Sequence, residues 1–292
     1  EGGHGGQALS YDREKEVFCW AATRGSASGS SGNVNGIYSS TIALNSAWNS
    51  DNRGVSRGSA VTWNVGTSQT ESIGPQAMIY VGDDAGSSAG KHVLLYAHAA
   101  SSLRAVVGTI SESGGSYSVD WNTPLTNYAT FGSSGTNHEA HGCKVADNKI
   151  VAFWTRGDEG WCRVGTVASG LITFGTAVSV PIAYSDSGLG PSSESICYDI
   201  ASGKVVFAWW EWNGNGSDKL MTRTGTVTGT NIAVGTPYEI HAYATQTHGK
   251  VSVVYDENAQ RTVIYYKRMD YGDSAVKLYA RAGTITGTNI AF

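Results

Sequence analysis

The sequence of 292 residues is poor in charge. Only 15% of its residues are Asp, Glu, Lys or Arg, and the net charge at pH 7 is −4, whereas globular proteins usually carry about a quarter of charged residues. No block of basic residues is present, although a protein that binds a phosphate backbone needs one. We therefore expect no nucleic-acid partner.

Long apolar runs are also missing. No stretch of 18 or more apolar residues occurs, so we expect no membrane span. The first residues, EGGHGG, contain neither an initiator methionine nor a signal peptide, which predicts a processed or excised segment. A single glycosylation sequon, Asn215-Gly216-Ser217, favours an extracellular or secreted location, or a virion surface.

Cysteines are few and have no metal-binding spacing. The chain has four, without a CxxC pair, which is too few for a disulfide scaffold and argues against zinc. Cys143 and Cys197 are expected on neighbouring strands, and whether they form a disulfide stays open.

The sequence is instead rich in glycine, and it repeats itself. A Gly-Thr-Val/Ile step begins at Gly108, Gly165, Gly225 and Gly283, at intervals of 57, 60 and 58 residues. A second marker, an acidic residue that ends an alternating apolar run, occurs five times, at Asp12, Asp83, Asp147, Asp199 and Asp256. Markers that alternate in this way indicate five copies of one structural unit.

Each copy reads as four strands, and helical periodicity is absent. A short apolar run ending in an aromatic follows each acidic residue, at Trp20, Tyr96, Trp154, Trp209 and Tyr266. We expect the acidic residues to cap turns and the rings to fill the space between units. Five units of this kind predict an all-β fold, a five-bladed β-propeller of four-stranded antiparallel blades. We expect one domain with blades at about residues 1–72, 73–136, 137–189, 190–244 and 245–292.

The unit from Gly225 to Pro237, GTVTGTNIAVGTP, followed by the Tyr255 to Tyr266 segment, resembles β-propeller repeats of marine viral tail or adhesion proteins and of secreted proteins from marine invertebrates. The five-unit count is also similar to that of tachylectin-type lectins, in architecture alone. The resemblance implies a propeller fold and carries over no catalytic residue.

The loops between the second and third strands vary while the rest repeats, which is typical of a scaffold that presents binding residues. Three of these loops place aromatic rings beside polar groups, a combination that suits a sugar; rings that merely cover the rim are the alternative. The candidate ligand-binding residues are Arg156, Asp158, Trp161, Trp212, Asn213, Asp218, Asp270 and Tyr271.

Three histidines precede predicted inner strands, at His4, His141 and His248. They are weak candidates for a metal site, because Ile73 and Pro191 occupy the matching positions of the other units. We expect neither a metal nor another cofactor.

Acidic residues near the channel would be needed for a glycosidase-like enzyme, and the candidates at comparable positions are Glu139 and Glu194. Two carboxylates do not distinguish a site from polar lining, and no other catalytic motif is present. We therefore expect a non-enzymatic, lectin-like binding or adhesion protein whose partners are glycans or a cell or matrix surface. The alternative is a structural protein that self-assembles as a homo-oligomer or filament in a matrix, biomineral or viral tail fibre, which the low charge favours.

Overall fold

The structure is a computed structural model that describes most of the chain. The described residues are 7–13, 15–24, 36–48, 53–58, 61–64, 74–83, 90–98, 102–121, 127–133, 140–156, 159–182, 194–211, 218–243, 251–268 and 277–292. Every regular element among them is a β-strand, which confirms the all-β prediction. No helix in this part of the chain is long and apolar enough to cross a membrane.

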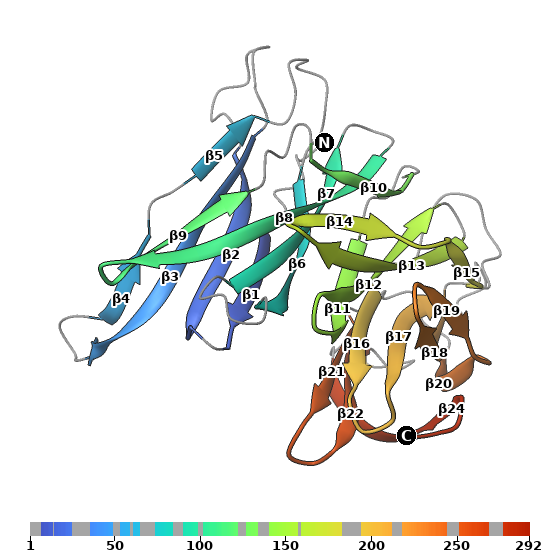
Figure 1. The fold of residues 1–292 in the computed structure, drawn as a ribbon. Coiled ribbons are helices and arrows are strands. Elements are labelled where there is room, and N and C mark those ends of the chain that lie inside the picture. Colours follow the sequence, from blue (N-terminus) through green and yellow to red (C-terminus); the bar gives the residue numbers. More distant parts are fainter. Residues whose placement is uncertain are drawn as a thin grey trace, which may run out of the picture. The chain divides into compact units, whose positions relative to one another are not determined.

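The strands form five antiparallel sheets, which we number along the chain (Figure 1). Sheet 1 contains β1 (Gln7–Asp12), β2 (Val17–Arg24), β3 (Gly36–Trp48), β4 (Arg53–Arg57) and β5 (Val61–Asn64). Sheet 2 contains β6 (Gly74–Asp83), β7 (Gly90–His98), β8 (Ser102–Ser113), β9 (Ser116–Trp121) and β10 (Ala129–Gly132). Sheet 3 contains β11 (Ala140–Ala146), β12 (Lys149–Arg156), β13 (Glu159–Ala168), β14 (Leu171–Phe174) and β15 (Val178–Val180).

Sheets 4 and 5 complete the described fold. Sheet 4 contains β16 (Glu194–Asp199), β17 (Lys204–Glu211), β18 (Asp218–Thr228), β19 (Asn231–Val234) and β20 (Tyr238–Tyr243). Sheet 5 contains β21 (Val251–Asp256), β22 (Arg261–Arg268), β23 (Lys277–Thr286) and β24 (Asn289–Ala291). Each of the five ranges expected for a repeat thus holds one sheet.

The chain divides into two compact units. The first comprises residues 1–134, 146–150 and 165–174, and the second comprises residues 135–145, 151–164 and 175–292. Sheets 1 and 2 belong to the first unit and sheets 4 and 5 to the second, while the strands of sheet 3 are divided between them. That the five sheets form a single domain stays a prediction.

Four of the sheets have five strands where four were expected, because the outer strand is interrupted. In sheet 3, β14 and β15 both pair with β13, and in sheet 4, β19 and β20 both pair with β18. The interruption falls at a glycine whose amide still bonds the third strand: Gly175 N donates to the Val164 carbonyl at 2.9 Å and Gly235 N to the Thr224 carbonyl at 2.8 Å. Sheets 1 to 4 therefore keep the four expected strand positions, with the outer one split in two, and sheet 5 has four strands.

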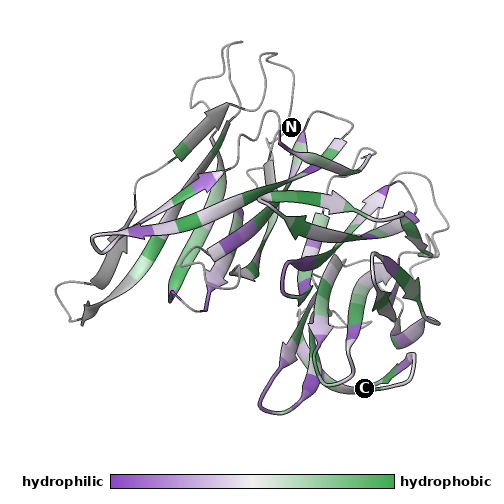
Figure 2. Cartoon of the chain, in the orientation of Figure 1, coloured by the Kyte–Doolittle hydropathy of each residue, from purple (hydrophilic) through white to green (hydrophobic). Residues whose placement is uncertain are grey.

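Two of the acidic residues at the ends of the inner strands, Asp199 and Asp256, cap turns as predicted. Asp199 Oδ1 accepts hydrogen bonds from the backbone N and the hydroxyl of Ser202, each at 2.9 Å. Asp256 Oδ1 accepts from the backbone N of Asn258 and Ala259 at 2.9 Å. Figure 2 shows the turn between β21 and β22 as hydrophilic.

The aromatic ends of the second strands lie mostly in the cores, as predicted. Tyr96, Trp154, Trp209 and Tyr266 are buried. Trp20 is only half-buried, because in β2 the alternate residues Cys19 and Ala21 take the buried face. In the second unit, one core cluster joins Phe153 of β12 to Phe207 of β17, with ring centroids 5.1 Å apart, and so packs sheet 3 against sheet 4.

Candidate functional site

A group of charged side chains in the second unit lies where β17 ends. The strand sequence KVVFAWWE alternates between two faces, so that Phe207 and Trp209 pack toward sheet 3 while Ala208 and Trp210 pack toward sheet 5. Glu211 comes two residues after Trp209 and therefore lies on the same face of the strand, toward sheet 3. The next residues, 212–217, lie outside the described part of the chain.

Glu211 is a buried carboxylate with a specific donor. Only 9% of its surface is exposed, and its Oε1 accepts a hydrogen bond from Trp209 Nε1 at 3.1 Å. The indole itself is fully buried. Because a buried charge is costly without partners, this bond and the neighbouring cations together make an ionised Glu211 tenable.

Two cations of β18 act on Glu211. Lys219 pairs with it in register across β17 and β18, and Arg223 lies farther along the same strand. A hydrogen bond to Glu239 and its negative charge raise the pKa of the Lys219 amine, and Glu211 adds to this effect; the ion pair of Lys219 Nζ with Glu239 Oε2 measures 2.9 Å. Partial burial lowers the pKa of the Arg223 guanidinium, and the negative charge of Glu211 acts in the opposite direction and raises it. Arg223 Nη1 also donates to the Gly235 carbonyl at 3.3 Å.

A second glutamate lies near this group by backbone register. Glu194, the first residue of β16, pairs with Trp209, so its position is diagonal to that of Glu211. Diagonal positions of paired strands are about 7–8 Å apart. Sheet 4 therefore brings together one buried carboxylate and two cations, with the backbone position of a second glutamate diagonal to that of Glu211.

The structure describes only part of the sites predicted from the loops. Arg156 is exposed at the end of β12, and Trp161 is half-buried on β13, where its indole nitrogen has no hydrogen-bond partner among the described residues. Asp218 is the first residue of β18. The other ligand-binding candidates lie outside the described residues: Asp158, Trp212, Asn213, Asp270 and Tyr271. Their role stays a prediction.

The histidine and cysteine predictions have a similar outcome. His141 is half-buried on β11, whereas His4 and His248 lie outside the described residues. Among the residues that the structure describes, no group of three His, Cys, Asp or Glu side chains could hold a metal ion. The thiols of Cys143 and Cys197 are free. Burial raises the pKa of both thiols, and each is therefore protonated at neutral pH.

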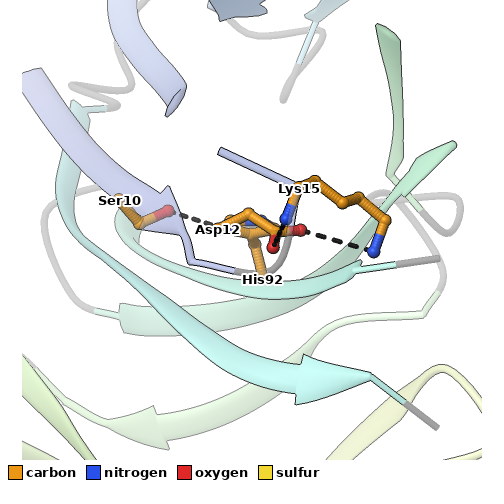
Figure 3. A network of polar contacts seen from close by, with 4 residues as sticks. All are labelled: Ser10, Asp12, Lys15 and His92. Carbon is orange, nitrogen blue, oxygen red and sulfur yellow. Dashed lines mark hydrogen bonds and ion pairs between the residues drawn. The ribbon is translucent and has the colours of Figure 1, made fainter. Parts of the chain in front are cut away.

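A second polar group lies in the first unit. Figure 3 shows Ser10, Asp12, Lys15 and His92 close together, with Ser10 Oγ 2.6 Å from His92 Nδ1. Asp12 Oδ1 accepts from the backbone N of Lys15 at 3.0 Å, and Asp12 Oδ2 is 3.7 Å from Lys15 Nζ. A serine bonded to a histidine is the arrangement of an activated nucleophile, but both residues are buried. We therefore assign this group to the packing of sheet 1 on sheet 2.

The sequence contained signals for the Glu211 group that were not recognised. Trp209 was identified as a packing residue, but its place two residues before Glu211 on a strand also puts an indole donor beside a carboxylate. Arg223 also belongs to a pattern in the sequence. An arginine stands two residues before the repeated Gly-Thr step in three units, at Arg163, Arg223 and Arg281.

The sequence matches no family model and no curated protein. Its structure is similar to solved structures of carbohydrate-processing enzymes. These include a Hadza microbial sialidase, Hz136 (10% identity, TM-score 0.48, 94% of this chain and 52% of that one), and the K499G mutant of NanB sialidase from Streptococcus pneumoniae (11%, 0.52, 91% and 53%). A third is a GH43_1 enzyme from Xanthomonas citri (9%, 0.41, 99% and 91%). The chain spans about half the length of the two sialidases.

These similarities bear on the fold and on the predicted function. At 11% identity, the likeness to NanB sialidase shows a fold of the β-propeller type. Our prediction of a non-enzymatic lectin-like or structural protein is wrong, because the structure matched with a TM-score above 0.5 is that of a sialidase. That prediction was based on the low charge and the repeats of the sequence. A repeated scaffold can also carry one active site on a single repeat.

Proposed function

We propose that this chain is a glycoside-hydrolysing propeller whose carboxylates are Glu211 and Glu194. The observation that carries the proposal is the placement of these two glutamates at diagonal positions at the same end of sheet 4. Glycosidases use a pair of carboxyl groups, one as acid and the other as base or nucleophile, about 5–9.5 Å apart. The two backbone positions are about 7–8 Å apart, which is close enough for glutamate side chains to present their carboxyl groups at such a separation.

The surroundings of Glu211 support the same chemistry. A carboxylate that is buried, bonded to an indole and faced by two cations is held in one orientation, which a base or nucleophile requires. NanB is named as a sialidase, and the Xanthomonas protein is named as a GH43_1 enzyme. The name of NanB supports glycosides as the substrate class. The substrates proposed for this chain are therefore glycans.

The arrangement of the five sheets belongs to the same proposal. We propose that they are the blades of a five-bladed propeller, supported by five repeats, five sheets and the similarity to NanB sialidase. A secreted location fits an enzyme that acts on glycans. Self-association and the resemblance to marine tail-protein and invertebrate repeats stay predictions.

A panel of fluorogenic glycosides tests the function. We expect the purified chain to release 4-methylumbelliferone from at least one of its α- or β-linked sialic acid, galactose, xylose, arabinose and glucose derivatives. Glu211→Gln and Glu194→Gln should each lower kcat by about 100-fold or more, while Glu112→Gln, which changes an exposed glutamate of β8, should retain activity. No release from any glycoside, or full activity in both glutamine variants, would contradict the proposal.

A further inference from the structure

We propose that Trp209 is a positioning residue that, together with Arg223 and Lys219, holds Glu211 in its ionised form, so that Glu211 is the base or nucleophile and Glu194 supplies the proton. The assignment of catalytic roles rests on the proposed function. The positioning of the carboxylate by the indole does not depend on it.

The indole is placed to act on one oxygen of Glu211. Trp209 Nε1 donates to Oε1 at 3.1 Å, and an indole nitrogen can only donate. Such a bond is about twice as strong to a carboxylate as to a neutral acceptor, so it favours the ionised acid. The ring is fully buried in the core between sheets 3 and 4, which fixes the donor in place.

The charges around Glu211 act in the same direction. On its own sheet the facing cations are Lys219 and Arg223, and Glu239 shares Lys219 through the 2.9 Å ion pair. The remaining titratable groups in or against the core cluster that joins the two sheets are Cys143 and Cys162 of sheet 3 and Tyr198 of sheet 4. Burial raises the pKa of both thiols, so at neutral pH neither adds charge. The positive charges of Lys219 and Arg223 therefore favour an ionised Glu211.

The next residue provides a matched control. Trp210 is also a buried tryptophan of β17, but it packs toward sheet 5, with its ring centroid 6.2 Å from that of Tyr266. Its indole nitrogen has no hydrogen-bond partner in the described part of the chain. Trp209→Phe and Trp210→Phe thus remove the same atoms from the same strand, and only the first removes a donor to Glu211.

The test follows the Glu211 carboxyl carbon by ¹³C NMR during a pH titration, with the signal assigned through Glu211→Gln. We expect Trp209→Phe to move the titration midpoint to higher pH by about one unit, since a hydrogen bond to a charged group contributes about 1.5–3 kcal/mol. Trp210→Phe should leave the midpoint unchanged. Equal shifts in the two variants, or no shift in Trp209→Phe, would overturn the proposal.

A second measurement needs no change at Trp209. The indole Nε1–H resonance of Trp209 should titrate with the same midpoint as the Glu211 carboxyl, and that titration should vanish in Glu211→Gln; an indole signal that is insensitive to pH contradicts the proposal. If both NMR results are as expected but no glycoside is hydrolysed, the positioning stands and the proposed function fails. If activity is present, the acidic limb of the kcat/KM profile should move with the NMR midpoint in Trp209→Phe.

Discussion

The aspartates that end the inner strands differ in their hydrogen-bond partners, and therefore in how much they stabilise the fold. Asp199 is buried and serves two sheets, since Oδ1 binds Ser202 of its own turn and Oδ2 accepts from Thr262 Oγ1 of sheet 5 at 2.8 Å. Asp256 is exposed, and the two donors to its Oδ1, the backbone N of Asn258 and of Ala259, lie within its own turn. The same residue type thus closes a turn in one place and also joins two sheets in the other.

Replacing these two aspartates separates the two roles. Asp199→Ala should lower the free energy of unfolding by about 3 kcal/mol, because it leaves the buried Thr262 hydroxyl and the Ser202 groups without their acceptor. Asp256→Ala should cost about 1 kcal/mol, because water can replace an exposed turn bond. Urea denaturation of the two variants measures the difference, and equal losses would show that the bond to Thr262 adds nothing.

How far the residues could be predicted depends on whether their role is local. The capping by Asp199 and Asp256 follows from turn chemistry within three residues, and it was predicted. The hydrogen bond from Thr262 to Asp199 joins residues that are 63 apart in sequence, so no local sequence pattern predicts it. The Glu211 group combines both cases, since Trp209 is two residues away whereas Lys219 and Arg223 come from the next strand.

At the scale of the element, the repeated Gly-Thr step is explained by the hairpin of the third and outer strands. A side chain at the glycine would meet a ring or an aliphatic group of the outer strand: a Cβ at Gly108 would lie 2.5 Å from the Trp121 ring, at Gly165 2.8 Å from Phe174, and at Gly283 2.6 Å from Phe292. Each hairpin therefore requires a residue without a side chain opposite its bulky outer residue.

Two of these glycines should respond differently to substitution. Trp121 is buried, and its indole donates to Ser39 Oγ at 2.7 Å, so it cannot move aside easily. Phe292 is only half-buried. Gly108→Ala should therefore lower the free energy of unfolding by about 3 kcal/mol, and Gly283→Ala by about 1 kcal/mol. Thermal unfolding of both variants tests this, and a larger loss for Gly283→Ala would refute the explanation.

The last glycine of the repeat explains why the outer strand is split in two. Gly175 and Gly235 interrupt the outer strand, and a Cβ there would meet the turn of the following sheet, at the Thr230 carbonyl for Gly175 and at the Thr288 carbonyl for Gly235. The sequence predicted a single outer strand in each unit. The close approach of the next sheet at these glycines joins residues about 55 apart in the chain, which a single sequence does not show.

At the scale of the whole molecule, neighbouring sheets within each unit are joined by recurring bonds. Thr224 Oγ1 donates to the Thr288 carbonyl at 2.6 Å between sheets 4 and 5, and Thr41 Oγ1 donates to the Tyr117 carbonyl at 3.0 Å between sheets 1 and 2. Repetition of sequence therefore produces repetition of contacts, which is why the number of sheets was predictable. The function was not, because the candidate site uses Glu211, which has no counterpart in the other repeats.

Buried thiols should make the stability of the whole chain sensitive to alkaline pH. Desolvation raises the pKa of Cys19, Cys162 and Cys197 from an ordinary value of 9.0 to about 12. Below pH 9 both the folded and the unfolded chain keep these protons, so the thiols cost nothing. Above pH 9 the unfolded chain releases them while the folded chain does not, and stability falls by roughly 1 kcal/mol per thiol at pH 10.

Thermal unfolding between pH 7 and pH 11 measures this loss. We expect Tm to be nearly constant to pH 8.5 and then to fall, and we expect the native thiols to react slowly with a disulfide reagent at pH 8. The double variant Cys19→Ala and Cys162→Ala should unfold at a lower temperature throughout, because it loses buried contacts. Its Tm should nevertheless fall less steeply above pH 9, since two of the titrating groups are gone. The same slope in the double variant would assign the alkaline loss to other groups, of which Tyr96, whose pKa burial also raises, is the first to test.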